Sequence, residues 1–468
     1  MSHEIRANYS QVWLLPPSLD ELLPQDHPAR FIREFVDMLD LRQLGFKMRK
    51  GEEGRPNYAA DLLLKVWLYG YLERIRSSRR LEKACRQDMA LMWLTGLNYP
   101  DHNSLWRFWN DNRKSMKKIF KQTIQIAAKA ELIGMVLHAL DGTKITARAS
   151  TDKMWGRKIL EKKLAQLDKS IAEMVAEVDR SERQEGGEYR LPEALVGKQK
   201  LREVIQAKLS ELEKEGREHM HPGEKDATVM KNHEGTRLGY NAQAVVDEKS
   251  GLIIAADVTN EGNDKRQLVP MLERVKEELG NVAEETAADS GYWSGEQLAK
   301  AEEANFPVLV NLDEIKAERE LAGPYGASNF TYDKEKDCYV CPQGEELTYE
   351  RTRQANQGRV YRCHRCKCCS ARGECTNDQA GRSVERSPYI EARLRQEEKQ
   401  RDEAKRKMLR QRMKTVEPVF AVVKELLGFR RFSFGGLAKV RPQWWFLCSL
   451  VNLVRIYPLW RAGTLEFN

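Results

Sequence analysis

The stretch that decides the fold is VLHALDGTKI, residues 136–145. Its first half is apolar, as in a short buried β-strand, and we expect the strand to end at Asp141, where Gly142-Thr143 turns the chain. Acids rarely occupy such positions without a partner or a function. Asp141 is therefore the first candidate functional residue.

Two further acids stand in comparable settings. Asp289 directly follows a short β-type run, and Glu417 lies in an apolar-periodic helical segment with Val416 and Phe420 turned inward. Because Pro418 disfavours α geometry in the residue before it, we expect Glu417 at a helix start or kink. A few carboxylates on rigid elements can hold two Mg²⁺ or Mn²⁺ ions, the arrangement that cleaves phosphodiesters. If the three acids meet in space, they form a two-metal nuclease site.

The order of the predicted elements indicates the fold class. Around Asp289 the pattern predicts strands at 239–247 and 252–259, a helix over 265–280, a strand ending at 289, a helix at 295–304 and a strand at 306–311. Acids after the first and fourth strands, with one on a later helix, are typical of a ribonuclease-H-like domain. We expect an α/β ribonuclease-H-like catalytic core with an all-α N-terminal domain, a helical-hairpin insertion and a small Cys-rich zinc-binding insertion.

Periodicity also sets the expected domain boundaries. The chain reads as helical over 58–132, and a heptad-like apolar seam begins at Leu160 and is broken at Glu185–Glu188 (EGGE) and Pro192. The predicted domains are a helical N-terminal DNA-binding domain (1–132), a catalytic domain (133–314 and 390–468), a helical hairpin (155–220) and a Cys-rich insertion (315–389).

Charge is segregated along the chain. The net charge of +8 divides into +7 over 1–150, −14 over 151–350 and +15 over 351–468. Basic ends favour contact with a polyanion such as DNA, because Lys and Arg displace the counterions of phosphates. The alternative is a set of solvated helical faces, and for the N-terminal domain a packing role with a basic outer surface. The candidate DNA-binding residues are Arg79, Arg80, Arg107, Arg412, Lys424, Arg430 and Arg431.

Seven of the nine cysteines fall between 338 and 375. Two Cys-x₂-Cys pairs, Cys338 with Cys341 and Cys366 with Cys369, have the spacing that suits a tetrahedral Zn²⁺ site. Three more thiols are alternative ligands, and a set of unligated thiols is the competing interpretation. The alternative ligands are Cys363, Cys368 and Cys375.

Motifs along nearly the whole chain then indicate a family. They are GRPNYAADLLLKVWLYGY and PDHNSLWRFW within 54–109, LDGTKITA (140–147), LGYNAQAVVD (238–247), TNEGND (259–264), ADSGYW (288–293), CPQGEEL (341–347), VEPVFAVVKELLGFRRF (416–432) and GGLAKV (435–440). Taken together and in this order, they resemble a bacterial insertion-sequence transposase of the DDE superfamily. The sequence departs from the family pattern at Gly435, where a basic residue is expected, and carries Cys363 and Cys368 beyond the usual cysteines.

The resemblance implies specific roles. It places the catalytic triad on Asp141, Asp289 and Glu417 and a positively charged partner on Lys424, with supporting positions at Asn241, Asn263, Asp264 and Tyr292. The implied enzyme binds the terminal repeats of its element and, using two Mg²⁺ or Mn²⁺ ions, cleaves double-stranded DNA and joins it to target DNA. We expect a homodimer on DNA, in the cytoplasm and associated with the nucleoid, without a membrane segment. The competing functions are a domesticated DNA-binding protein without catalysis and a nuclease without strand transfer.

Overall fold

The computed structural model describes residues 18–467 except 49–56, 151–153, 186–192, 215, 217, 222, 233–234 and 313–322. The chain divides into two compact units. The helical unit contains residues 1–132, 421–429 and 445–468, and the sheet unit contains 133–420 and 430–444. The predicted catalytic segment 390–468 is therefore shared between the two units.

The helical unit is built from short amphipathic helices around α2, which is buried along most of its length. Asp101 caps one of them, accepting hydrogen bonds from the backbone N–H groups of Asn103 and Ser104 at 2.9 and 3.0 Å. The helices are α1 (Pro28–Asp37), α2 (Ala60–Leu72), α3 (Ser78–Ala84), α4 (Met89–Thr95), α5 (His102–Asn112) and α6 (Met116–Lys129).

Two later segments complete the core of the helical unit. Phe446, in α15 (Leu437–Arg461), packs edge-on against Tyr71 and Trp109 with ring centroids 5.0 and 5.1 Å away. Arg74 donates to the carbonyl oxygens of Glu425 and Leu426 at 2.8 and 2.9 Å. These carbonyls end a five-residue π-helix (Val422–Leu426), where helical partners run out, so the arginine supplies the missing donors.

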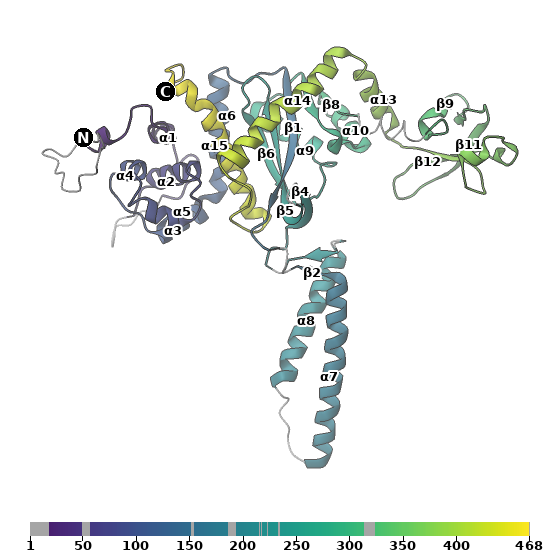
Figure 1. Ribbon diagram of the computed structural model, residues 1–468, viewed down its shortest axis with the longest axis horizontal. Coiled ribbons are helices and arrows are strands. Elements are labelled where there is room, and N and C mark those ends of the chain that lie inside the picture. Colours follow the sequence, from purple (N-terminus) through teal and green to yellow (C-terminus); the bar gives the residue numbers. More distant parts are fainter. Residues whose placement is uncertain are drawn as a thin grey trace, which may run out of the picture. The chain divides into compact units, whose positions relative to one another are not determined.

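A mixed β-sheet organises the sheet unit (Figure 1). β5 pairs antiparallel with β1 on one side and with β4 and β6 on the other, and β7 and β8 extend the sheet parallel to β1. The strands are β1 (Leu137–Thr146), β4 (Thr228–Asn232), β5 (Gly235–Asp247), β6 (Ile253–Thr259), β7 (Glu285–Ala288) and β8 (Val308–Val310).

The two faces of this sheet contact different helices. Leu140 and Val245 pack with residues of α9 (Leu268–Leu279) and α10 (Gly295–Glu303) in one apolar core. Successive side chains of a strand point to opposite faces, so Asp141 faces the other way. On that side, α14 (Glu403–Ala421) brings Arg412 to Asp141. Among the helices that the structure describes, none is long and apolar enough to span a membrane.

Two insertions interrupt the sheet unit. α7 (Arg157–Glu185) and α8 (Glu193–Lys214) pack through Leu160, Ile205 and Leu212, as predicted for a helical hairpin (Figure 1). The predicted break at residues 186–188 and Pro192 lies outside the described residues, as does the predicted boundary at 314/315. The Cys-rich segment forms an antiparallel sheet of β9 (Thr331–Asp333), β10 (Cys338–Val340), β11 (Glu346–Thr352), β12 (Arg359–Arg362) and β13 (Ser383–Arg386), followed by α13 (Ile390–Lys399).

The observed order of β1, β5, β6, α9, β7, α10 and β8 confirms the predicted order of elements. One local prediction is wrong and a second is wrong in part. The chain does not turn at Gly142, because β1 continues to Thr146 in register with β5. Of the two positions predicted for Glu417, the helix start is excluded, because α14 begins at Glu403 and continues past Pro418, and the kink stays a prediction.

Candidate active site

Strand register brings two of the predicted acids together. β1 and β7 run parallel with Leu140 beside Ala288, so the next residues, Asp141 and Asp289, extend from neighbouring strands toward the same face. Asp289 also caps a short 3₁₀ helix (Ser290–Tyr292) by accepting a hydrogen bond from the N–H of Gly291 at 3.0 Å. The sheet thus sets the points at which both residues follow their strands.

Asp141 is held by two donors. One oxygen accepts the backbone N–H of Gly142 at 2.7 Å, and the other lies 3.0 Å from Nη1 of Arg412. Burial raises the pKa of Asp141 to about 6, against the lowering effect of Arg412 and with a further rise from the neighbouring charge of Asp289. Two carboxylates and a guanidinium therefore share one partly buried site, which suits binding of a hard cation through oxygen.

A second polar network lies behind Gly142, on the α9 face of the sheet. Asp264 accepts hydrogen bonds from Asn241 and Gln243, both at 2.6 Å, and its two oxygens lie 3.2 and 3.1 Å from Nζ of Lys144. The hydroxyl of Tyr292 donates to Gln243. Asn241, Asp264 and Tyr292 thus belong to one network beside the strand that carries Asp141, and their supporting role stays a prediction. Sequence analysis missed Lys144, although it follows Asp141 by only three residues.

The position of Asn263 is different. Its side chain is exposed and its oxygen accepts only a local hydrogen bond from the N–H of Lys265, at 3.3 Å, among the contacts described for it. Asn263 therefore shapes the turn before α9 and does not join the network around Asp264.

The structure does not bring Glu417 to the other two acids. Arg412 lies on the buried stripe of α14 with Val416, Val419 and Phe420, whereas Glu417 is exposed. At 3.6 residues per turn, Glu417 points about 140° away from Arg412 around the helix axis. Accordingly, no group of three or more His, Cys, Asp or Glu residues among those described is placed to hold a metal ion. Asp141 and Asp289 suit a cation, and the third ligand is not in place.

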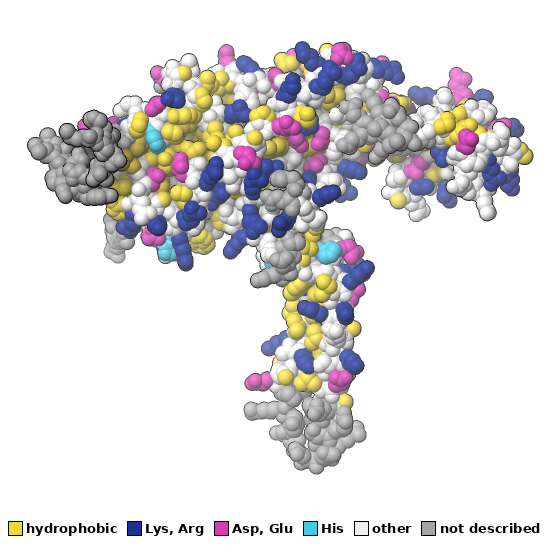
Figure 2. Space-filling model, in the orientation of Figure 1, with side chains coloured by type: hydrophobic (Ala, Val, Ile, Leu, Met, Phe, Trp, Pro, Cys, Tyr) yellow, Lys and Arg dark blue, Asp and Glu magenta, His cyan; other side chains and the backbone are white. Residues whose placement is uncertain are grey.

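The predicted DNA-binding residues occupy several surfaces. Arg79 and Arg80 on α3, Arg107 on α5, and Arg430 and Arg431 are exposed. Figure 2 shows further Lys and Arg side chains gathered over the region of α13 and α14. Lys424 is half-buried in the π-helix, and Arg412 turns inward to Asp141. Arg412 is therefore committed to a carboxylate and is not on the outer basic surface.

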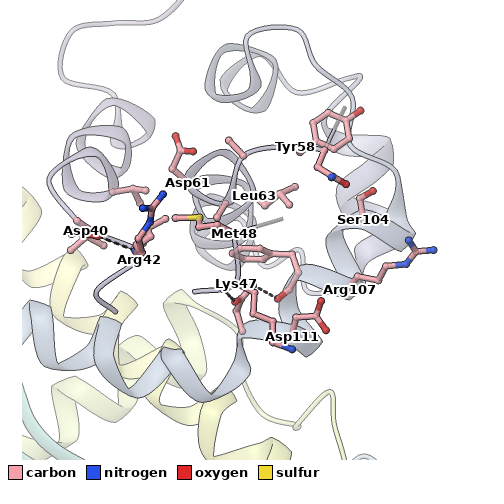
Figure 3. Close-up of a pocket in the computed structure, with 18 of the residues that line it drawn as sticks. Asp40, Arg42, Lys47, Met48, Tyr58, Asp61, Leu63, Ser104, Arg107 and Asp111 are labelled. Carbon is pink, nitrogen blue, oxygen red and sulfur yellow. Dashed lines mark hydrogen bonds between the residues drawn. The ribbon is translucent and has the colours of Figure 1, made fainter. Parts of the chain in front are cut away.

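A cavity of about 900 Å³ opens in the helical unit, and Figure 3 shows Arg42 and Arg107 on opposite sides of it. Its charged lining consists of Arg42, Lys47 and Arg107 together with Asp37, Asp40, Asp61, Asp101 and Asp111. Five acids against three bases make the lining net acidic, which disfavours a phosphate-bearing ligand. The cavity therefore gives no support to DNA contact at Arg107.

The cysteines group differently from the predicted pairs. Cys341, Cys363, Cys366, Cys369 and Cys375 line one small cavity in the Cys-rich sheet. Backbone N–H groups of Glu345 and Arg382 point at the sulfurs of Cys341 and Cys366, each at 3.3 Å. Burial raises the pKa of Cys363 to about 11 and also raises that of Cys375.

Two cysteines lie apart from this cavity, and one of them, Cys338, is in the predicted ligand set. The charged groups acting on the Cys338 thiol are Glu346, Asp333, Lys336 and Asp337, with no cysteine among them. Residues three apart in an extended strand face opposite sides, so Cys338 and Cys341 diverge where β10 ends. Cys368 is exposed. The cavity therefore favours a four-cysteine site drawn from the five cysteines that line it, and the ligand set stays a prediction.

Two parts of the chain match known protein families. Residues 340–457 match a family model described as a transposase DDE domain, and residues 17–111 match one described as a transposase domain (DUF772). No match was found among curated proteins or solved structures. The first match covers Glu417 and Lys424, and the second covers most of the N-terminal helices. Both matches are to transposase families, and together they support an insertion-sequence transposase of the DDE superfamily.

Proposed function

We propose that this transposase binds the terminal repeats of its insertion sequence, cleaves the DNA at each end and joins the ends to target DNA at a single site. The observation that carries the proposal is the adjacency of Asp141 and Asp289 on neighbouring parallel strands. The strand order, with an antiparallel β1–β5–β6 meander extended by parallel β7 and β8, supports a ribonuclease-H-like core.

The residues have separate tasks in this proposal. Asp141 and Asp289 would hold divalent cations, Mg²⁺ or Mn²⁺, and the Lys144–Asp264 pair with Gln243 fixes the strand behind them. Bound there, two such ions would supply a nucleophile from water or a 3′-hydroxyl and stabilise the leaving oxygen. Glu417 is the third proposed ligand, and α14 must turn or shift for it to take part.

DNA binding is proposed for the exposed arginines Arg79, Arg80, Arg430 and Arg431, and for the basic surface over α13 and α14. Since an insertion sequence has two ends, we propose that two copies of the chain act as a homodimer on DNA. Binding to DNA would associate the protein with the nucleoid in the cytoplasm.

A structural Zn²⁺ ion is proposed for the cysteine cavity. The N–H groups aimed at Cys341 and Cys366 would stabilise thiolates, as donors around metal-bound cysteines do. Cys369, which follows Cys366 at the paired spacing, is the third proposed ligand, and Cys363 or Cys375 would be the fourth. Such an ion would tie together loops that otherwise share only a small apolar core.

The proposed reaction is tested with a labelled duplex carrying the element's end sequence, incubated with Mg²⁺ or Mn²⁺. We expect cleavage and strand transfer by the wild type, both lost in Asp141→Asn and Asp289→Asn while binding to the duplex is kept. Glu417→Gln tests the third ligand, with Glu398→Gln, an exposed residue of α13, as its control. Cleavage without joining would identify a nuclease, and binding without cleavage would identify a regulator, which the outward position of Glu417 favours among the alternatives.

A further inference from the structure

The ion pair between Arg412 and Asp141 joins two elements at the proposed cation site. Nη1 of Arg412 lies 3.0 Å from Oδ2 of Asp141, across 271 residues of sequence. Only 13% of the arginine side chain and 23% of the aspartate side chain are exposed. A charge-assisted bond shielded from water in this way is stronger than a surface ion pair. The guanidinium therefore supplies positive charge directly beside Asp141.

The other basic side chains near the site form ion pairs with other acids. Lys144 contacts both oxygens of Asp264 on the opposite face of the sheet. Arg410, one half-turn from Arg412, pairs with Glu403 at the surface, where the two side chains are 68% and 66% exposed. Arg412 is thus the cation that α14 directs at Asp141.

The same pair also sets the rotation of α14. Arg412 and Glu417 point about 140° apart around the helix axis, so a rigid helix cannot present both to the acids at once. While Arg412 contacts Asp141, Glu417 stays on the exposed side. Any turn or shift that brings Glu417 toward Asp141 must break the Arg412–Asp141 contact.

We propose that Arg412 is a displaceable counter-ion that keeps the site inactive. It neutralises Asp141 until a divalent cation binds, and its release then allows α14 to move and Glu417 to approach. This inference rests on the proposed function, since it assumes that Asp141 binds the cation. Arg412 is a positioning residue in this scheme, and its loss should strengthen cation binding, whereas loss of a merely structural arginine should not.

The proposal is tested by titrating the full-length protein with Mn²⁺ in the absence of DNA. Binding is measured by calorimetry, at a pH well above the pKa values of the carboxyl groups. Arg412→Gln should bind Mn²⁺ about tenfold more tightly than the wild type, because removing a charged hydrogen bond of this kind removes the competitor. Arg410→Gln is the matched control, with the same charge change on the same helix, and should match the wild type. Equal or weaker binding by Arg412→Gln overturns the proposal.

A second measurement guards against simple loss of structure. Mn²⁺ should raise the Tm of Arg412→Gln more than that of the wild type, because the ion restores the neutralisation that the variant lacks. If the Gln variant does not fold, Arg412→Lys carries the test. Its single ammonium cannot form the planar guanidinium contact, so its Mn²⁺ affinity should lie between those of the wild type and the expected Gln value. An affinity no higher than that of the wild type would contradict the counter-ion role.

Asp141→Asn separates this proposal from the proposed function. If Asp141→Asn binds Mn²⁺ as tightly as the wild type does, Asp141 is not a cation ligand and the proposed function itself fails. If it abolishes binding while Arg412→Gln gains nothing, only the counter-ion role fails.

Discussion

Gly142 of β1 stands directly against the amide of Gln243. A Cβ atom at residue 142 would lie 2.3 Å from Nε2 of Gln243, 2.8 Å from Oδ1 of Asp264 and 2.9 Å from Oδ1 of Asn241. Asn241 and Gln243 are fully buried, and all three side chains are bonded to one another, so none can move aside alone. The glycine that follows Asp141 is required by this close approach and not by a turn.

Gly142→Ala should therefore destabilise the protein. Overpacking of a filled, hydrogen-bonded site costs roughly 1–3 kcal/mol of unfolding free energy, measured by denaturant unfolding. Gly197→Ala is the matched control, because nothing lies within 4 Å of the added Cβ and the residue is inside α8. The control should be neutral or slightly stabilising, since alanine favours helix. Equal stability of Gly142→Ala and wild type would show that the network can rearrange freely.

The cysteine cavity predicts which thiols matter for zinc. Cys341→Ser should lose bound zinc and unfold at a lower temperature, because its sulfur lines the cavity and receives a backbone N–H. Cys368→Ser should keep its zinc, because that side chain is exposed. Metal content of the purified variants, measured by inductively coupled plasma mass spectrometry, checks both.

Cys338→Ser tests whether the zinc ligands come from the cavity. The Cys338 thiol is buried away from the other sulfurs, so the variant should lose some packing stability but retain its zinc. Loss of zinc from Cys338→Ser, with retention by Cys341→Ser, would restore the pairing that the Cys-x₂-Cys spacing predicts.

Asp337 predicts an acid-sensitive element in the Cys-rich sheet. Hydrogen bonds from the hydroxyls of Tyr332 and Tyr361, together with Arg359, hold the pKa of Asp337 down to about 2. A depressed pKa means stability that is present above the ordinary aspartate pKa, near 4, and lost as pH falls toward 2. Asp337→Asn should thus be less stable than the wild type at neutral pH. The difference should vanish between about pH 4 and pH 2 in thermal melts, and a difference that persists at pH 2 would assign the effect to packing.

The helices and strands of the sheet unit could be predicted from sequence because each has a clear apolar period, as in Leu268–Leu279 and Ile253–Thr259. Features that depend on a facing element could not. The Gly142-Thr143 pair resembles a turn until β5 is seen to place Gln243 against it. The Cys-x₂-Cys spacing does not reveal that Cys338 lies in a strand.

The orientation of α14 is an intermediate case. Arg412 precedes Val416, Val419 and Val423 by four, seven and eleven residues, which places it on the buried stripe of the helix. Glu417 is off that stripe. The inward position of Arg412 was therefore readable from periodicity alone, whereas its partner Asp141 required the three-dimensional structure.

DNA binding by the helical unit gives the last prediction. Arg79 and Arg80 are neighbouring exposed residues of α3, and the double substitution Arg79→Gln/Arg80→Gln should weaken binding to any duplex. If both arginines contact phosphates, the slope of log affinity against log salt should become shallower by about 2. Each lost phosphate contact means that roughly one counterion fewer is released on binding. Arg202→Gln is the control and should leave the slope unchanged, because Arg202 of α8 pairs with Asp168 of α7. Arg107→Gln should have a smaller effect than the α3 pair, because its cavity is lined by more acids than bases. Fluorescence anisotropy at several salt concentrations measures all three, and a slope unchanged by the double substitution would remove α3 from the DNA-binding surface.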